Sequence, residues 1–451
     1  MTNHRLFIFD DLSPEDLAML QALYSRSGES VATHIEKVRA AGSGKFMQSY
    51  YVGYNHKSIA DCGTTTMFIE NVSLLAAKAI QDWPLYSGQE TSTRYIDMSK
   101  RDIVDPINTP ESAAILQKWM NFYIGKQGEV ADLIRKRYPI KDGEKPEVYE
   151  KAVKARTFDT LRGFLPAGIT TQLSWHTNLR QAGDHLLSLV NHPSPEIQHL
   201  SKHLNMILDL RYPSSGFGTS TAAVSGVGNK DAVELEKRKT WEAEVAKTYT
   251  YQPPNGYVVH GEHVAFRTDL QHYQFEEYQK LFDTRPRGCV LPHFLTDLGL
   301  LHFDFNLDFG SFRDIQRHRN GVCRMPLLTT SLGFEPWYLD QLGGGHLLTS
   351  ALNLINDQTW RINDLTTDPV LRQYYTALGY RVHTSLTYGL PAAAYVMELR
   401  SGKMIHPSLR KKVHSMIACF RTTFPQVRLH VDLDPDDWDV RRGTQTITKK
   451  E

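Results

Sequence analysis

The segment from Ser87 to Tyr95 is dense in side chains that form hydrogen bonds. It reads Ser-Gly-Gln-Glu-Thr-Ser-Thr-Arg-Tyr and contains no apolar residue before Tyr95. Hydroxyl and backbone N–H groups bind anionic oxygens, Glu90 can accept from a ring N–H or a sugar hydroxyl, and Arg94 can neutralise a negative charge. The segment therefore predicts a site for an anion or a polar ring, with a solvated loop at a helix end as the alternative.

The run Arg317-His318-Arg319 is a second candidate, expected at the end of a helix. On a helix the three side chains point in directions about 100° apart, so they could meet a phosphate, a flat ring and a partner surface separately. The alternative is a structural role, because cationic groups are favourable near the negative end of a helix dipole.

A strand followed directly by a helix is predicted ahead of each candidate. In the first half, Thr64 to Val72 is rich in strand-forming residues, and Ser73 can cap a helix over Leu74 to Gln81. In the second half, His302 to Phe309 alternates apolar and polar residues as a half-buried strand does, and Gly310 to Arg319 follows it. Both candidates are thus expected at the end of the same kind of unit.

The chain of 451 residues is longer than one hydrophobic core usually supports. Pro213 to Asn229 is rich in Gly, Ser and Thr and is predicted to be a linker or loop, followed by a charged helix over Asp231 to Lys247. The predicted domains are therefore residues 1–212 and 230–451, joined by residues 213–229.

Long amphipathic stretches, at Ala182 to Leu208 and Gly344 to Leu365, are predicted to be helical. Together with the strands they indicate an α+β fold with helices packed around mixed or antiparallel sheets.

Composition excludes several classes of function. A net charge of +1 does not favour a general nucleic-acid binder, which needs a sustained basic field. No signal peptide or membrane span is indicated, so neither nucleic acid nor membrane is an expected partner. The four cysteines form no CxxC pair, which argues against a disulfide framework or a thiolate metal site and favours the cytoplasm.

The motifs resemble those of flavin-dependent thymidylate synthases, whose signature has the form RHRxxSxNExSxR after an HxS[VI] segment. His56-Lys57-Ser58-Ile59 is similar to the HxS[VI] segment, and Ser87-x-Gln89-Glu90-x-Ser92-x-Arg94 matches the end of the signature with Gln for Asn. Asp82-Trp83-Pro84 stands where RHR would be. Conversely, Arg317-His318-Arg319 matches RHR in the second half, where Val322 to Pro326 replaces the end of the signature.

Three further elements follow the same resemblance. Arg162 to Pro166 is similar to the family's R-x-x-L-P element, Trp175 to Arg180 to W-x-x-N-x-R, and Leu399-Arg400 to its L-R step. Each half keeps what the other lacks, which indicates two divergent copies of the family's fold in tandem. Family sites lie between subunits, so the resemblance implies a homodimer that imitates a tetramer.

The resemblance also implies roles for these residues. Arg317 and Ser92 would act at the reacting pyrimidine. The nucleotide would be bound by Ser87, Gln89, Glu90, Arg94, Arg162 and Arg400. The flavin would be held by His56, Ser58, Asn178, Arg180, His318 and Arg319.

The implied reaction is reductive methylation of dUMP, with methylenetetrahydrofolate as carbon donor and NADPH as hydride donor through FAD. One departure bears on the substrate: Asp314 stands three residues before the RHR run, where the family commonly has glutamine. An acceptor-only carboxylate in place of an amide changes what can be recognised. Two alternatives therefore stay open, a flavin-dependent C5-alkylating enzyme acting on another pyrimidine nucleotide and a non-catalytic protein that binds flavin or nucleotide.

Overall fold

The computed structural model describes residues 6–53, 56–217, 263–271, 273, 275–436 and 438, with isolated residues between 237 and 248. The predicted linker from Gly218 onward and most of the helix predicted over Asp231 to Lys247 lie outside these residues. The chain forms two compact units: unit 1 is Met1–Glu70, Leu85–Glu90 and Gln172–Tyr249, and unit 2 is Asn71–Pro84, Thr91–Thr171 and Thr250–Glu451. Unit 2 therefore contains parts of both predicted halves.

Unit 1 combines a small helical cluster with most of a two-stranded sheet. The cluster has its own core of Met19, Leu20 and Val38. Strands β1 (Thr64–Ser73) and β2 (Thr170–Asn178) pair with each other, and their unit 1 portions are Thr64–Glu70 and Gln172–Asn178. The helices are α1 (Pro14–Tyr24), α2 (Val31–Ala41), α3 (Gly44–Phe46), α4 (Lys57–Ala60), α9 (Leu179–Leu189) and α10 (Pro195–Arg211), with a π-helix at Met47–Gly53.

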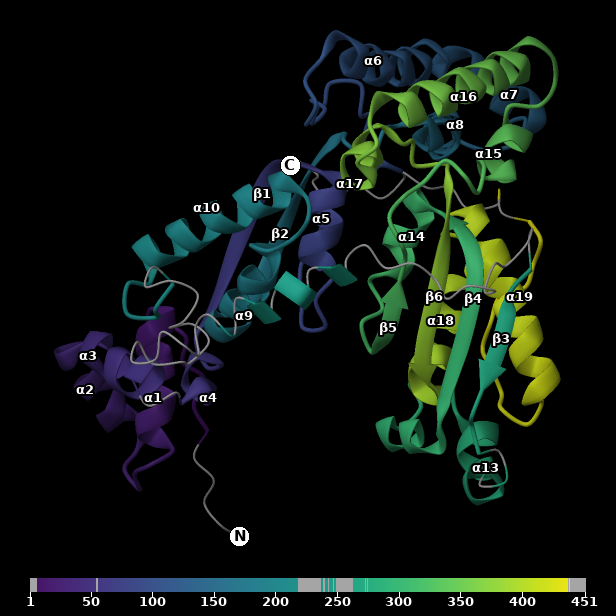
Figure 1. Cartoon of the computed structure of the whole chain (residues 1–451). Coiled ribbons are helices and arrows are strands. Elements are labelled where there is room, and N and C mark those ends of the chain that lie inside the picture. The colour runs from purple at the N-terminus through teal and green to yellow at the C-terminus, as the bar shows by residue number, and fades with distance from the viewer. Residues whose placement is uncertain are drawn as a thin grey trace. The chain divides into compact units, whose positions relative to one another are not determined.

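Unit 2 is built on a four-stranded antiparallel sheet in the order β3-β4-β6-β5 (Figure 1). The strands are β3 (Ala265–Thr268), β4 (Leu300–Asp308), β5 (Gly321–Arg324) and β6 (Arg381–Gly389). The prediction of a half-buried strand at His302 to Phe309 was wrong in its burial, because Asp304 and Asn306 are only 4% and 5% exposed. Both faces of β4 are covered.

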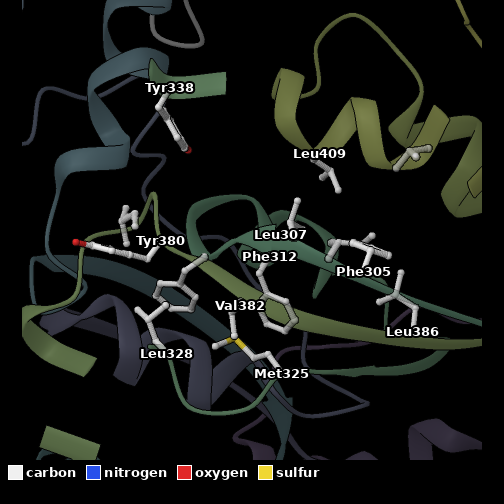
Figure 2. Close-up of a cluster of buried hydrophobic side chains, with 14 of the residues drawn as sticks. Phe305, Leu307, Phe312, Met325, Leu328, Tyr338, Tyr380, Val382, Leu386 and Leu409 are labelled. Carbon is white, nitrogen blue, oxygen red and sulfur yellow. The ribbon is translucent and has the colours of Figure 1, made fainter. Parts of the chain in front are cut away.

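The helices of unit 2 supply the rest of its core. Phe305 and Leu307 of β4, Phe312 of the helix that follows and Leu409 belong to one buried apolar cluster (Figure 2). The helices are α5 (Leu74–Gln81), α6 (Pro110–Gly125), α7 (Gln127–Arg137), α8 (Pro146–Leu161), α13 (Phe275–Thr284), α14 (Phe309–Ile315), α15 (Pro336–Gln341), α16 (Gly345–Leu365), α17 (Pro369–Arg372), α18 (Leu390–Arg400) and α19 (Pro407–Thr423), with 3-10 turns η2 (Arg162–Phe164), η5 (His293–Leu298) and η6 (Gln373–Tyr375).

Several local predictions are confirmed. The strand β1 leads into α5, and the Ser73 hydroxyl caps that helix by accepting from the backbone N–H of Ala76 at 3.0 Å. The helix predicted over Gly344 to Leu365 is α16. The stretch Ala182 to Leu208 is helical as predicted except for a break, since α9 ends at Leu189 and α10 begins at Pro195. Proline at the first helical position favours a new start over a continuous helix.

A repeated hydrogen-bonding pattern joins the segments after η2 and η6 within unit 2. Ala167 N donates to Thr376 O at 2.9 Å, and its counterpart, Leu378 N, donates to Leu165 O at 2.8 Å. Between these bonds Pro166 and Ala377 face each other in an antiparallel bridge. Such reciprocal bonds are what a local two-fold relation between the two segments produces.

A second reciprocal pair requires glycine at equivalent places. Gly168 N donates to Tyr374 O at 2.8 Å and Gly379 N donates to Gly163 O at 2.7 Å. A Cβ atom on Gly168 or Gly379 would lie within 3 Å of backbone oxygens, so no larger residue fits either position without a shift.

The elements that follow also correspond in length. Helices α9 and α18 have 11 residues each, and α10 and α19 have 17 each and begin on proline. This is the pattern expected of two copies in one chain, and the tandem origin stays a prediction.

No helix in the described part of the chain combines the length and the apolar character needed to cross a bilayer.

Candidate functional site

Asp314, in the last turn of α14, lies at the centre of a group of arginines in unit 2. Its carboxylate Oδ2 is 3.7 Å from Nη1 of Arg162, which begins η2. Its backbone carbonyl accepts a hydrogen bond from Nη2 of Arg400, the last residue of α18, at 2.7 Å. We call Arg94, Arg162, Arg317 and Arg400, together with Asp314, the arginine cluster.

Electrostatics show that all four arginines act on this carboxylate. Burial alone would raise the pKa of Asp314, but the surrounding positive charges outweigh it and hold the pKa below its usual value. In order of effect the arginines are Arg162, Arg94, Arg317 and Arg400. The carboxylate is therefore ionised at neutral pH, and the cluster has an excess of positive charge.

Arg94 is held by a buried aspartate. Its Nε and Nη2 donate to Asp159 Oδ1 and Oδ2 at 2.8 and 3.2 Å, and its Nη1 donates to the carbonyl of Met404 at 3.0 Å. Burial, followed by the charge of Arg162, lowers the pKa of Arg94 to about 10, so it is still cationic at neutral pH. A bidentate pair of this kind fixes the plane of the guanidinium.

Arg162 is 1% exposed and is fixed by polar groups of α14 and α15. Its Nη2 donates to Ser311 Oγ at 2.9 Å, and its Nε donates to the hydroxyl of Tyr338 at 3.3 Å. That hydroxyl donates in turn to Asp308, which also caps α14 by accepting from Ser311 N at 2.9 Å. The strand-to-helix junction of the second half thus positions an arginine of the first.

Two residues that the sequence reasoning left without a role complete this network. Ser408 Oγ donates to Asp308 Oδ1 at 2.5 Å and lies 2.8 Å from Nδ1 of His406. His406 is fully buried, and burial together with nearby arginines, Arg162 first, holds its pKa well below the usual value. Asp308 caps α14, which begins at Phe309, whereas the sequence had placed Asp308 inside a strand that ends at Phe309, so the N-cap position was missed.

His318 is buried and accepts a hydrogen bond at Nε2 from Nε of Arg400, at 2.7 Å. The proton of its neutral ring is therefore assigned to Nδ1. Burial, then the charge of Arg400, lowers the pKa of His318 to about 3, so the ring is neutral at physiological pH.

The Arg317-His318-Arg319 run does not lie on a helix, and that prediction was wrong. Helix α14 ends at Ile315, and the run follows in a turn and irregular backbone. Arg317 is exposed, whereas Arg319 donates to the carbonyls of Gln81 and Arg317 at 2.9 and 3.1 Å. The three side chains therefore have different surroundings. We had expected this difference to come from their spacing around a helix, whereas it comes from the turn.

The polar segment that begins at Ser87 is divided between the two units. Ser87, Gln89 and Glu90 belong to unit 1, where the chain runs antiparallel along β2: His176 N donates to Ser87 O at 2.7 Å, and Glu90 bridges to Leu173. A Cβ at Gly88 would come within 2.0 Å of Ser174 O, so glycine allows this close approach.

Ser92 and Arg94 belong to unit 2, where Ser92 Oγ accepts from Arg94 N at 3.2 Å. The segment therefore consists of two isolated bridges to β2 followed by a turn.

The residues implied to hold flavin from the first half lie in unit 1. Arg180 donates to Asp61 at 2.7 Å and to Asp184 at 3.1 Å. Asn178 caps α9 by accepting from Gln181 N at 2.8 Å. His56 and Ser58 flank the start of α4.

Within unit 2 the structure brings together Arg94, Arg162, Arg317, Arg400 and His318. The predicted residues Ser87, Gln89, Glu90, His56, Ser58, Asn178 and Arg180 are in the other unit.

The buried histidines lead to a prediction about pH. In the unfolded chain a histidine has a pKa of about 6.5, so below that value the unfolded state binds a proton that folded His318 does not. The free energy of unfolding should fall as pH drops from about 6.5 to 5, by about 1.4 kcal/mol per pH unit for each such histidine. Urea unfolding of His318→Gln should show a shallower slope by that amount. An unchanged slope would mean that His318 is protonated in the folded protein.

Comparison with known proteins adds the following. The family model described as thymidylate synthase complementing protein matches residues 10–214. A UPF0159 protein of Thermoplasma acidophilum is 22% identical, with 96% of this chain and 98% of the relative covered. UPF0159 proteins of Chlamydia pneumoniae and Chlamydia muridarum are 22% and 24% identical, covering 90% and 79% of this chain and 83% and 75% of the relatives. The relatives from Thermoplasma acidophilum and Chlamydia pneumoniae, with 96% and 90% of this chain covered, extend beyond the family match into the part of the chain that contains Arg317 and Arg400.

Proposed function

Because residues 10–214 belong to the family of thymidylate synthase complementing proteins, we propose that this chain is a flavin-dependent thymidylate synthase-like enzyme whose arginine cluster binds a pyrimidine nucleoside monophosphate. The reaction we propose is C5-methylation of dUMP, with methylenetetrahydrofolate and NADPH as co-substrates. The working assembly we propose is a homodimer.

One observation carries this proposal: Arg94 and Arg162 from before the predicted linker and Arg317 and Arg400 from after it all act on Asp314 within one compact unit. Guanidinium groups match the geometry of phosphate oxygens and remain charged at all relevant pH values. Asp159 pairs with Arg94 and Asp308 lies 3.9 Å from Arg162, so with Asp314 three carboxylates face the four guanidinium groups, and one positive charge is left for a phosphate. The complementary loss of motifs between the halves is consistent with this arrangement.

The roles of the individual residues follow from their contacts. Arg94 and Arg162 are held rigidly by Asp159 and by Ser311 with Tyr338, so they would meet the phosphate without losing side-chain freedom. Exposed Arg317 would close over the ligand. A cation fixed beside a pyrimidine stabilises negative charge that develops on the ring.

The donor set fits a flavin in part. FAD, when bound, supplies hydride transfer. Neutral His318 has its Nε2 occupied by Arg400, so its Nδ1–H is a donor suited to the acceptor atoms of a flavin ring. In unit 1, Arg180 is engaged by two carboxylates and Asn178 by the start of α9.

Ligand-dependent melting tests the proposal. dUMP should raise the melting temperature of the full chain in the presence of FAD, whereas deoxyuridine at the same concentration should not, because the phosphate contacts supply much of the affinity. Protein purified without added FAD, or freed of unbound FAD by gel filtration, should be yellow. Equal shifts in melting temperature with dUMP and deoxyuridine would contradict phosphate binding by the arginine cluster. A colourless protein that binds dUMP would favour the non-catalytic binding protein instead.

A further inference from the structure

Asp314 presents a carboxylate oxygen without a hydrogen-bond donor inside the arginine cluster. Oδ2 is buried, and among the described residues none donates a hydrogen bond to it. The nearest guanidinium nitrogen given by the structure, Nη1 of Arg162, is 3.7 Å away, beyond hydrogen-bond distance. A buried ionised oxygen is costly when left without a donor, so a native structure that keeps one calls for a partner.

The chemistry of the cluster restricts what that partner can be. Arginine side chains only donate hydrogen bonds, and an ionised carboxylate only accepts them. A ligand that satisfies both must have an anionic group and, close to it, an O–H or N–H donor. The side chain of Asp314 is 20% exposed as a whole, although its Oδ2 is buried.

The position of Asp314 indicates which part of a nucleotide supplies the donor. The carboxylate lies among the same arginines that we propose for the phosphate, so the donor must be near the phosphate on the ligand. In a nucleoside 5′-monophosphate the sugar hydroxyls are nearer to the phosphate than the donors on the base are.

We infer that Asp314 accepts a hydrogen bond from a sugar hydroxyl of the bound nucleotide, so that the site selects a nucleotide with a free 3′-hydroxyl. This inference rests on the proposed function. The hydrogen bond from the hydroxyl offsets the electrostatic repulsion between the carboxylate and the phosphate. A nucleotide that lacks the hydroxyl is repelled without this compensating hydrogen bond.

Calorimetric titration of the full chain with two ligands tests the inference: dUMP and 2′,3′-dideoxyuridine 5′-monophosphate, which lacks the hydroxyl. A hydrogen bond to a charged group is worth about tenfold or more in affinity, so the wild-type protein should bind dUMP at least about tenfold more tightly. Asp314→Ala should bind the two ligands equally. Asp340→Ala, which removes an exposed carboxylate of α15, should keep the wild-type preference.

Each other outcome decides the question. If the wild-type protein binds both ligands equally, the inference is overturned while nucleotide binding stands. If Asp314→Ala strengthens binding of both ligands by the same factor, the carboxylate only repels the phosphate. If the wild-type protein binds neither ligand, the proposed function itself fails and the inference fails with it.

Discussion

Replacing Arg162 by alanine is expected to destabilise the protein by about 3–5 kcal/mol, the cost of leaving buried charges without their partner. Arg162 is 1% exposed, and its guanidinium lies 3.9 Å from Asp308, which is fully buried, and 3.7 Å from Asp314. Its removal also takes a donor from Ser311 and from Tyr338. The free energy of unfolding of unit 2, measured by urea denaturation, is the readout.

Arg361→Ala is the matched control. Arg361 is half exposed on α16 and pairs with Asp357 four residues earlier at 2.9 Å. A surface pair of this kind contributes about 0.5 kcal/mol. Equal losses in the two variants would show that the Asp308–Arg162–Asp314 arrangement does not stabilise the fold. Equal losses would also contradict the idea that these contacts hold the Arg162 side chain rigidly in place.

Replacing Arg317 by alanine should have the opposite profile: loss of dUMP binding with an unchanged melting temperature. Arg317 is exposed, and among the described residues its side chain acts on Asp314 through its charge and makes no hydrogen bond. Losing one charged contact to a phosphate costs on the order of 2–5 kcal/mol, which is about 30-fold or more in dissociation constant. Titration of dUMP and a melting curve of the same sample provide the two measurements.

A mixture of Arg317→Ala with Arg94→Gln distinguishes a site within one chain from a site between chains. Both arginines act on Asp314 within unit 2 of a single chain, so every site in the mixture should carry one of the two substitutions. Mixing after joint unfolding and refolding should therefore restore no dUMP binding. Recovery of up to about a quarter of the wild-type sites would mean that the cluster is completed by a second chain.

The sequence alone was sufficient for the elements whose signals are local. Ser73 before an Ala- and Leu-rich run predicted the start of α5 correctly because an N-cap depends on residues a few positions apart. The same holds for α16. The resemblance of the first half to the family could be recognised from short motifs, since each is a run of contiguous residues. The complementary loss of motifs also pointed to the arginines from both halves as one group.

The tertiary structure decided what those residues contact. Arg94 lies against Asp159 and Arg162 against Ser311, pairs separated by 65 and 149 positions, and no local pattern specifies such distances. It also decided that Arg317 to Arg319 follow α14 instead of extending it, because the last turn of a helix is set by packing and backbone partners more than by propensity. Asp314 was visible in the sequence only as a departure from a motif. Its role as the anionic centre of four arginines appears only when η2, α14 and α18 are packed together, since electrostatic interactions depend on distance in space and not along the chain.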